Sequence, residues 1–227
     1  ATFKDLAKAK KFRDIYLIGA DLSTGFSKVF CYNNTPDVKV ADAARISMSI
    51  PLFFRAVQNI NNDGHVYVDG GLLDNYPIKV FDRVSFISKE SNRRETAYYE
   101  RDNKSLTRKL GQIDKQVYNK ETLGFRLDSK EEINKFLHPD MEMPIKNDIK
   151  TIFTYSKALV TTLIDFQNNV HLHSDDWQRT VYIDSLGVGS VDFNISDSKK
   201  KDLVKSGVDY TQKYLNWYNN DEEKANK

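Results

Sequence analysis

The segment "HVYVDGGLLDNYPI", residues 65–78, limits what this chain can fold into more than any other stretch. Its short apolar run predicts a strand that ends at Asp69 and is followed at once by Gly70 and Gly71. The preceding Asp63-Gly64 pair predicts a hairpin turn, because both central positions of that turn favour positive φ. We therefore expect a hairpin whose second strand carries a carboxylate at its C-terminal end.

Short apolar segments and a helix are predicted upstream of this strand. Residues 15–22 and 27–32 are typical of two strands joined by a turn that contains glycine. Residues 40–50 predict a helix that ends before Pro51, because proline lacks the backbone N–H and restricts the residue before it. The residues that share one face of this helix are Val40, Ala44 and Met48.

The composition changes after Ile87. Residues 89–122 are dense in charge and poor in aliphatic side chains, so they predict a solvated, partly helical excursion rather than a core element. A strand is expected at 123–128. A helix should then begin at Ser129, since Glu132 lies three residues later in a capping-box pattern.

The C-terminal part predicts two helices and one more strand. Residues 147–169 form a long amphipathic pattern that we expect to pack on the core rather than act as a lipid lid. Residues 179–185 predict a strand, and residues 195–218 a last helix. The apolar stripe of the first helix is Ile149, Ile152, Phe153, Ser156, Leu159, Val160 and Leu163; the packing residues of the last are Leu203, Val204, Val208, Tyr214 and Leu215.

Strands and helices alternate along most of the chain, which predicts an α/β layered sheet. We expect one α/β unit over residues 1–227, with an Asp69-bearing core segment at 1–88 and the charged excursion and C-terminal elements at 89–227. In open α/β sheets, ligands bind at the C-terminal ends of strands. Asp69 lies at such an end.

Charge and cysteine content exclude several classes of protein. The 34 basic and 32 acidic residues leave a net charge of +2, which gives no electrostatic case for binding nucleic acid. The single cysteine, Cys31, excludes an internal disulfide and is expected to be a packed small residue. No apolar run approaches the roughly 20 residues that span a bilayer. The cellular location stays unknown; the cytoplasm or a membrane surface is favoured, and secretion stays open.

No nucleophile is recognised in these residues. The nearest match to a Gly-x-Ser-x-Gly elbow is "DLSTG", residues 21–25, but Asp21 stands where the strained turn needs glycine. Ser23 is therefore expected in an ordinary turn. Ser47 and Ser49 are expected to bond to a helix end, and no glycine-rich run forms a phosphate loop.

A metal site has weak support. His171 and His173 could join Asp175 or Asp176, but residues two apart share a side only on a strand, and this segment follows a long helix. We expect no metal and no cofactor. His65 and His138 are isolated and expected to be surface or hydrogen-bonded residues.

An Asp-Gly pair after a strand commonly forms only a turn, so the surrounding sequence decides whether Asp69 has a functional role. The run "IYLIGADLSTG…VADAARISMSIPLFF…VYVDGGLLDNYPI" resembles the patatin-like phospholipase family, and "TLGFRLDS" and "QRTVYIDSLGVGSVDF" resemble the C-terminal part of its bacterial members. The resemblance implies a patatin-like variant of the α/β-hydrolase sheet with helices on both faces, of which this chain is the C-terminal part.

The resemblance also implies a chemistry. Patatin-like enzymes are lipid acyl hydrolases with a serine–aspartate dyad, and Asp69 occupies the position of the family's aspartate in an Asp-Gly-Gly motif completed by Gly70 and Gly71. The family's serine elbow and its glycine-rich oxyanion loop lie upstream, and neither motif is present here. The implied partners are a phospholipid or other acyl lipid, and an N-terminal segment or second chain that carries the serine.

Three interpretations follow. The first is a phospholipase A or lysophospholipase for which this chain supplies the aspartate and is inactive alone. The second is a non-catalytic lipid-binding or interaction module with the same fold. The third, a metal-dependent hydrolase built on the histidine pair, has the least support.

Peripheral contact with a membrane is a further expectation from residues 89–122, where basic and aromatic side chains occur together. A solvated loop is the favoured reading of the same pattern. The side chains concerned are Arg93, Arg94, Tyr98, Tyr99, Arg101, Arg108 and Lys109.

Overall fold

The computed structural model describes residues 1–111, 114–130, 132–133, 148–170, 175–190 and 192–220. The chain forms two compact units. The first comprises residues 1–77 and 144–171, and the second comprises residues 78–143 and 172–227. The sequence-based division at residue 88 therefore differs from the division by contacts, which puts the charged excursion and residues 78–88 in the same unit.

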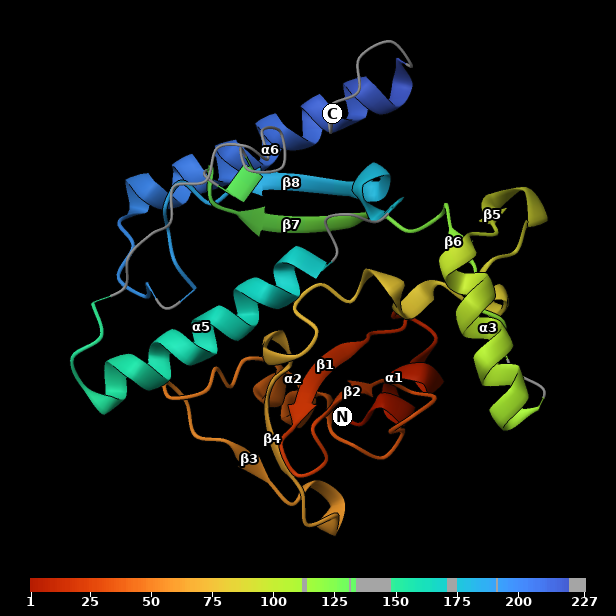
Figure 1. The fold of residues 1–227 in the computed structure, drawn as a ribbon, viewed down its shortest axis with the longest axis horizontal. Coiled ribbons are helices and arrows are strands. Elements are labelled where there is room, and N and C mark those ends of the chain that lie inside the picture. The colour runs from red at the N-terminus through yellow and green to blue at the C-terminus, as the bar shows by residue number, and fades with distance from the viewer. Residues whose placement is uncertain (112–113, 131, 134–147, 171–174, 191, 221–227) are drawn as a thin grey trace. The chain divides into compact units, whose positions relative to one another are not determined.

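The first unit is built on a four-stranded sheet with the strand order β2-β1-β4-β3 (Figure 1). Its strands are β1 (Leu17–Asp21), β2 (Phe26–Phe30), β3 (Val57–Gln58) and β4 (Val66–Asp69). All three strand pairs are antiparallel, and β1 lies between β2 and β4. The two strands expected upstream are confirmed, and the turn between them contains Gly25 with φ +76°.

The core of the first unit lies where helix α2 (Val40–Ser47) packs against β1 and β4. Helix α1 (Phe3–Ala9) adds Phe3, and the rings of Phe30 and Tyr67 meet edge to face with centroids 5.8 Å apart. Such ring pairs stabilise a core beyond their buried area. The buried members are Phe3, Phe30, Val38, Ala43, Ile46, Val57 and Tyr67.

Of the residues expected on one face of α2, Val40 packs against the core but Met48 does not. Ala43 and Ile46 are the buried side chains, whereas Met48 is 59% exposed. The pattern placed Met48 on the same face as Val40, but the helix ends at Ser47 and Met48 is its C-cap. The predicted end of the helix before Pro51 is confirmed.

The hairpin from β3 to β4 is confirmed, but its turn differs from the prediction. Asp63 has φ −80°, so only Gly64, with φ +73°, takes the positive value expected of both. The connection is longer than two residues, because a 3-10 turn at Ile60–Asn62 precedes Asp63. Tyr67 donates a hydrogen bond of 2.6 Å to the Asp63 carboxylate, which ties this turn to the strand.

Helix α5 (Ile152–Val170) also belongs to the first unit and contacts the residues that follow β4. The expectation that its apolar stripe packs in a core is wrong for several members. Ile152 is 80% exposed, and Phe153, Leu159 and Leu163 are about half exposed. Periodicity identified the helix but could not tell how much of the stripe finds a partner.

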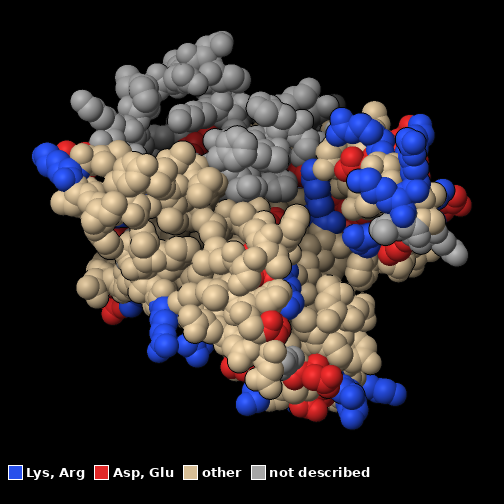
Figure 2. Space-filling view, turned by 60° about the horizontal axis from the view of Figure 1, so that its bottom comes forward, with Lys and Arg blue, Asp and Glu red and all other residues tan. Residues whose placement is uncertain are grey.

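In the second unit, two short strands and a helix correct the prediction of a solvated excursion. Strand β5 (Arg93–Arg94) pairs with β6 (Tyr118–Asn119), and helix α3 (Ala97–Leu110) lies between them in sequence. Charged side chains gather over α3, at the right of Figure 2. The same segment nevertheless buries Tyr99, Val117 and Tyr118, so it is part of a core.

The remaining strands are β7 (Gly124–Asp128) and β8 (Thr180–Asp184), which pair in parallel. Helix α6 (Asp197–Asn219) packs on β8 and buries Tyr214 and Ser206. Of the packing residues predicted for this helix, Tyr214 is confirmed, whereas Val204 and Val208 are 69% and 63% exposed.

The predicted capping box is confirmed. The Ser129 hydroxyl accepts from the N–H of Glu132, and the Glu132 carboxylate accepts from the N–H of Ser129. Most of the helix expected to follow lies outside the described residues. Helices with antiparallel and parallel strand pairs confirm the predicted α/β class. In the described part of the chain, no helix is long and apolar enough to cross a membrane.

Candidate active site

Asp69 is the last residue of β4, where the strand ends against its neighbour β1 (Figure 1). Its Cα lies opposite that of Gly19, and its N–H donates a hydrogen bond of 3.0 Å to the Ser49 carbonyl. The strand end predicted from sequence is confirmed. The sheet around it is antiparallel, however, so the strand-end rule for parallel sheets is not what positions this carboxylate.

One oxygen of the Asp69 carboxylate is held in place. Oδ1 accepts a hydrogen bond of 2.7 Å from the N–H of Gly71, as the cap of a 3-10 helix at Gly70–Leu72. Among the described residues, nothing donates a hydrogen bond to Oδ2. The side chain is therefore fixed through one oxygen, while the other can accept a proton from an incoming group.

The Asp69 side chain is half-buried, and this burial raises the pKa of its carboxyl group above the usual value. The hydrogen bond from Gly71 acts in the opposite direction, because it stabilises the charged form. A carboxylate with a raised pKa is a stronger base than a solvated one. Asp69 thus has the properties of a proton acceptor.

Gly70 and Gly71 are required by close approach rather than by positive φ. A Cβ atom on Gly70 would lie 2.5 Å from the Ile18 carbonyl oxygen, which is backbone and cannot move aside. On Gly71 it would lie 2.8 Å from Oδ1 of Asn75 and 3.1 Å from Oδ1 of Asp69. The two glycines therefore allow β4 to turn beside β1 and bring an N–H to the carboxylate.

Gly19 is a third such position, and sequence reasoning missed it. A Cβ there would lie 2.6 Å from Cγ2 of Ile46, so α2 packs directly on the backbone of β1 opposite Asp69. A glycine inside an apolar strand indicates that another element approaches the backbone closely, and this signal could have identified Gly19 from the sequence.

Exposed apolar side chains follow Ser49 in sequence. Leu52 has a positive φ of 72° in the turn that begins at Pro51, and Phe53 and Phe54 follow it with exposed side chains. Lys157 of α5 lies with its Nζ 5.9 Å from the centre of the Phe53 ring. The exposed fractions in this turn are Leu52 48%, Phe53 40% and Phe54 40%, and Met48, just before Ser49, is 59% exposed.

The serines near this strand have structural partners. The Ser49 hydroxyl donates a hydrogen bond of 2.5 Å to the Arg45 carbonyl, as expected for a hydroxyl tied to a helix end. The Ser23 hydroxyl accepts from the N–H of Val66 in the turn after β1. Of the serine hydroxyls that the structure describes, none hydrogen-bonds to Asp69.

A polar cluster at the opposite end of β4 was not predicted. Nδ1 of His65 lies 2.7 Å from Oδ2 of Asp21, which confirms that His65 is a hydrogen-bonded residue. Burial acts to raise the pKa of Asp21, but hydrogen bonds from His65, Thr24 and Ser23 outweigh it and hold the pKa below its usual value. Lys28 donates to the Tyr67 hydroxyl at 2.7 Å.

The remaining residues singled out from the sequence are the cysteine, the possible metal ligands and the possible membrane contacts. Cys31 is buried with a free thiol, which confirms it as a packed residue. Within the described ranges, no three His, Cys, Asp or Glu side chains gather in a way that could hold a metal ion. His138, His171 and His173 lie outside those ranges. Tyr99 is only 4% exposed, so it is not available to a membrane surface.

Comparisons with known proteins agree with the resemblance seen in the sequence. The family model described as patatin-like phospholipase matches residues 1–82, which include Asp69, Gly70 and Gly71. The resemblance is thereby confirmed for the part of the chain that forms β1 to β4.

Two relatives extend this finding. The uncharacterized protein YqhO of Bacillus subtilis (strain 168) is 28% identical over 226 residues, which cover 93% of this chain and 63% of YqhO. Probable lipid hydrolase 463L of Invertebrate iridescent virus 6 is 35% identical over 52 residues, 23% of this chain and 17% of that protein. The chain thus spans less than two thirds of the length of either relative.

Proposed function

We propose that this chain is part of a lipid acyl hydrolase of the phospholipase A or lysophospholipase type, and that Asp69 is its catalytic base. The nucleophile is a serine hydroxyl carried by a segment or partner chain outside these 227 residues, which also supplies the oxyanion hole. The family match over residues 1–82 and the name of the viral relative support the hydrolase class.

The observation that carries the proposal is the state of the Asp69 carboxylate. One oxygen is held by the Gly71 N–H, the other has no hydrogen-bond donor among the described residues, and burial raises the pKa. A serine hydroxyl is a weak nucleophile until a base within about 2.6–3.2 Å accepts its proton. Asp69 is fixed in position for that task and has an oxygen available for it.

The proposed reaction has two steps. As the serine oxygen attacks the ester carbonyl carbon, Asp69 takes the hydroxyl proton and then gives it to the leaving alcohol, which leaves an acyl-enzyme. Water then attacks the acyl carbonyl carbon while Asp69 accepts a proton from it. The bond to the serine oxygen breaks as Asp69 returns that proton to this oxygen, which releases the fatty acid and restores both the serine hydroxyl and the carboxylate. Donors in the oxyanion hole stabilise the tetrahedral intermediates by about 3 kcal/mol each.

The apolar turn after Ser49 supports a lipid substrate. The Ser49 carbonyl accepts a hydrogen bond from the N–H of Asp69. The exposed side chains of Leu52, Phe53 and Phe54 begin three residues after Ser49 in the sequence. Exposed apolar surface of this kind is suited to an acyl chain.

The test is release of fatty acid from phosphatidylcholine and lysophosphatidylcholine by the full-length protein. The Asp69→Asn variant keeps the oxygen that accepts from Gly71 but cannot take a proton, so we expect turnover to fall by about 100-fold or more. The matched control is Asp37→Asn in the same unit, whose carboxylate is 75% exposed and should leave turnover unchanged.

Equal turnover in the Asp69→Asn variant and the wild type would refute the role of Asp69. A folded full-length protein that releases fatty acid from neither lipid would instead favour a non-catalytic lipid-binding or interaction module.

A further inference from the structure

A second concave site lies entirely within the second unit. It is a pocket of about 970 Å³ between the β5–β6 pair, the segment Trp177–Arg179 and the last turns of α6. Pockets of roughly 300–1,000 Å³ are typical of small-molecule sites. This pocket does not contain Asp69, and nothing in the proposed hydrolase mechanism uses it.

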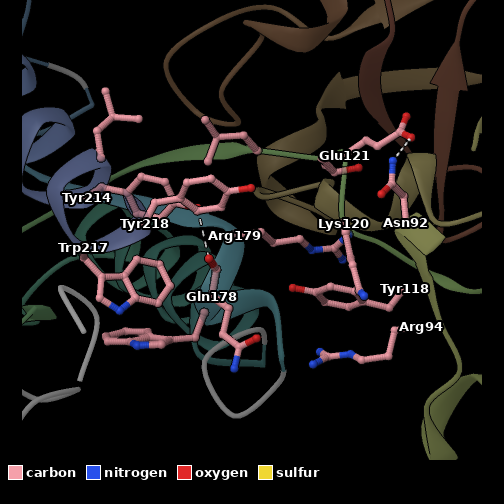
Figure 3. Close-up of a pocket in the computed structure, with 14 residues that line it drawn as sticks. Asn92, Arg94, Tyr118, Lys120, Glu121, Gln178, Arg179, Tyr214, Trp217 and Tyr218 are labelled. Carbon is pink, nitrogen blue, oxygen red and sulfur yellow. Dashed lines mark hydrogen bonds between the residues drawn. The ribbon is translucent and has the colours of Figure 1, made fainter. Parts of the chain in front are cut away.

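One end of the pocket is aromatic. Figure 3 shows Tyr214, Trp217 and Tyr218 together at that end, and Trp177 is also among the lining residues. Tyr214 is held by a hydrogen bond of 3.0 Å from its hydroxyl to the Gln178 carbonyl, and its ring lies 5.4 Å from that of Trp217. Tyr214 is thereby held in place, and the neighbouring rings of Trp217 and Tyr218 add aromatic surface beside it.

The other end is basic. The guanidinium carbons of Arg94 and Arg179 each lie 4.2 Å from the centre of the Tyr118 ring, and Figure 3 shows them on either side of it. The Arg179 charge is offset by Asp82 and Asp176, with which it forms ion pairs of 2.5 Å.

Lys120 is an available cation at the same end of the pocket. Its Nζ donates to the Ser91 carbonyl at 3.2 Å, and it forms no ion pair with any residue the structure describes. Glu121 is the acidic residue in the lining, and its carboxylate accepts from Asn92 at 2.5 Å. Three of the four charged lining residues are thus cations.

We propose that this pocket binds a small organic anion that carries a flat aromatic ring. The ring stacks on the wall formed by Tyr214, Trp217 and Tyr218, and the phosphate or carboxylate is held by Arg94 and Lys120. Flat rings gain from stacking on aromatic side chains, and planar guanidinium groups suit oxyanions. An alkyl chain has less to gain, because the aliphatic lining is limited to Leu123, Leu215 and the stems of polar residues.

The two tryptophans of this chain, Trp177 and Trp217, both line the pocket, so their fluorescence reports its occupancy. The probe is adenosine 5′-monophosphate, a flat ring with a phosphate, titrated into the folded chain at low salt. The comparison ligands are adenosine, inorganic phosphate and decanoate, which lack the charge, the ring and the aromatic character in turn. Calorimetry provides an independent affinity.

We expect saturable quenching by the monophosphate. Adenosine and inorganic phosphate should each bind about tenfold more weakly, because adenosine lacks the charge-assisted contact and inorganic phosphate lacks the stacked ring. Lys120→Met should weaken the monophosphate about threefold to tenfold and leave adenosine unchanged. Lys115→Met, an exposed lysine outside the pocket, is the control. Tyr218→Ala, which removes a ring that is 66% exposed, should weaken both ring ligands.

Each alternative outcome overturns the proposal. Absence of saturable quenching by the monophosphate at millimolar concentration shows that the pocket is not a site for this class of ligand. Inorganic phosphate binding as tightly as the monophosphate shows simple anion attraction. Tighter binding of decanoate than of the monophosphate shows a site for acyl chains. Equal affinity of Lys120→Met and the wild type for the monophosphate shows that Lys120 does not contact the phosphate.

Discussion

At the scale of the residue, the carboxylate of Asp69 combines two opposed requirements. It must be partly buried to be a useful base, and burial of a charge is unfavourable. The single hydrogen bond from Gly71 stabilises the charged form but does not cancel the effect of burial, and the net result is a raised pKa. The site therefore carries a cost in folding stability, and in the proposed mechanism this cost gives a stronger base.

The first prediction concerns the pH dependence of activity. Because Asp69 must be ionised to accept a proton and its pKa is raised, the acidic limb of kcat/KM should lie above the value of 3.8 of an ordinary aspartate. The pH–rate profile of the full-length protein measures this. An acidic limb at or below that value would show that Asp69 is not the group whose ionisation controls turnover.

The second prediction concerns stability at the same residue. A carboxyl group whose folded pKa is raised contributes stability that is present below its unfolded pKa and lost as the pH rises through the folded pKa. Asp69→Asn should therefore have an equal or higher Tm than the wild type at pH 7, although its turnover is expected to fall. A clearly lower Tm would mean that the ionised carboxylate stabilises the fold.

At the scale of the element, glycines differ in whether the structure has room for an added Cβ atom. Gly207 lies inside α6 with no atom near the position of a Cβ, whereas Gly70 lies against the Ile18 carbonyl. Glycine in a helix interior is destabilising relative to alanine by roughly 0.5–1 kcal/mol. The same substitution should therefore have opposite effects at these two positions.

The third prediction follows from that contrast. Gly207→Ala should stabilise the protein by about 0.5–1 kcal/mol, because the helix gains propensity without a clash. Gly70→Ala should destabilise it by about 1–3 kcal/mol, because β4 must shift away from β1. Urea unfolding measures both. Equal effects at the two positions would contradict the close approach described for Gly70.

The elements themselves were largely predictable from the sequence, and their buried faces were not. Strands β1, β2 and β4 are apolar runs bounded by turn residues, and Asp69 was identified from its Asp-Gly-Gly context. The buried face of α2 is set by its packing partner, so Ile46 is buried and Met48 is not. The stripe of α5 showed a helix, but periodicity carries no information on what covers it.

At the scale of the whole molecule, a buried ionic network organises the second unit. Arg179 is 4% exposed and donates to both oxygens of Asp82, to Asp176 and to the Asn119 carbonyl. The Tyr99 hydroxyl donates to the same Asp82 carboxylate. These residues come from segments far apart in sequence, which is why local patterns predicted a solvated excursion where the structure has a core.

The fourth prediction tests this network. Arg179→Met leaves Asp82 buried without its cation and leaves Asp176 with the more distant Lys79, so it should destabilise the second unit by about 3–5 kcal/mol. The control, Arg108→Met, removes an exposed arginine of α3 and should change stability by less than about 0.5 kcal/mol. Thermal unfolding distinguishes the two, and equal stability of the Arg179 and Arg108 variants would contradict the network's role.

The fifth prediction concerns Asp128, which lies beside Asp184 at the C-terminal ends of the parallel strands β7 and β8. Burial raises the pKa of its carboxyl group to about 6, although Arg126 acts in the opposite direction with an ion pair of 2.6 Å. A shift of about two pKa units corresponds to at most roughly 3 kcal/mol.

Because the folded pKa of Asp128 is raised, stability should fall as the pH rises from 4 to about 7. Asp128→Asn should reduce this dependence, so its unfolding free energy relative to the wild type should increase over that range. A difference between the two proteins that does not vary with pH would contradict the raised pKa.

The central claim is that Asp69 activates a serine hydroxyl, and the most direct measurement is the rate at which a fluorophosphonate modifies that serine in the full-length protein. This reaction needs an activated nucleophile but no lipid surface. We predict rapid modification of one serine in the wild type and a rate lower by about 100-fold or more in Asp69→Asn, as expected on loss of a general base. Modification of that serine at the same rate in both proteins would contradict the account.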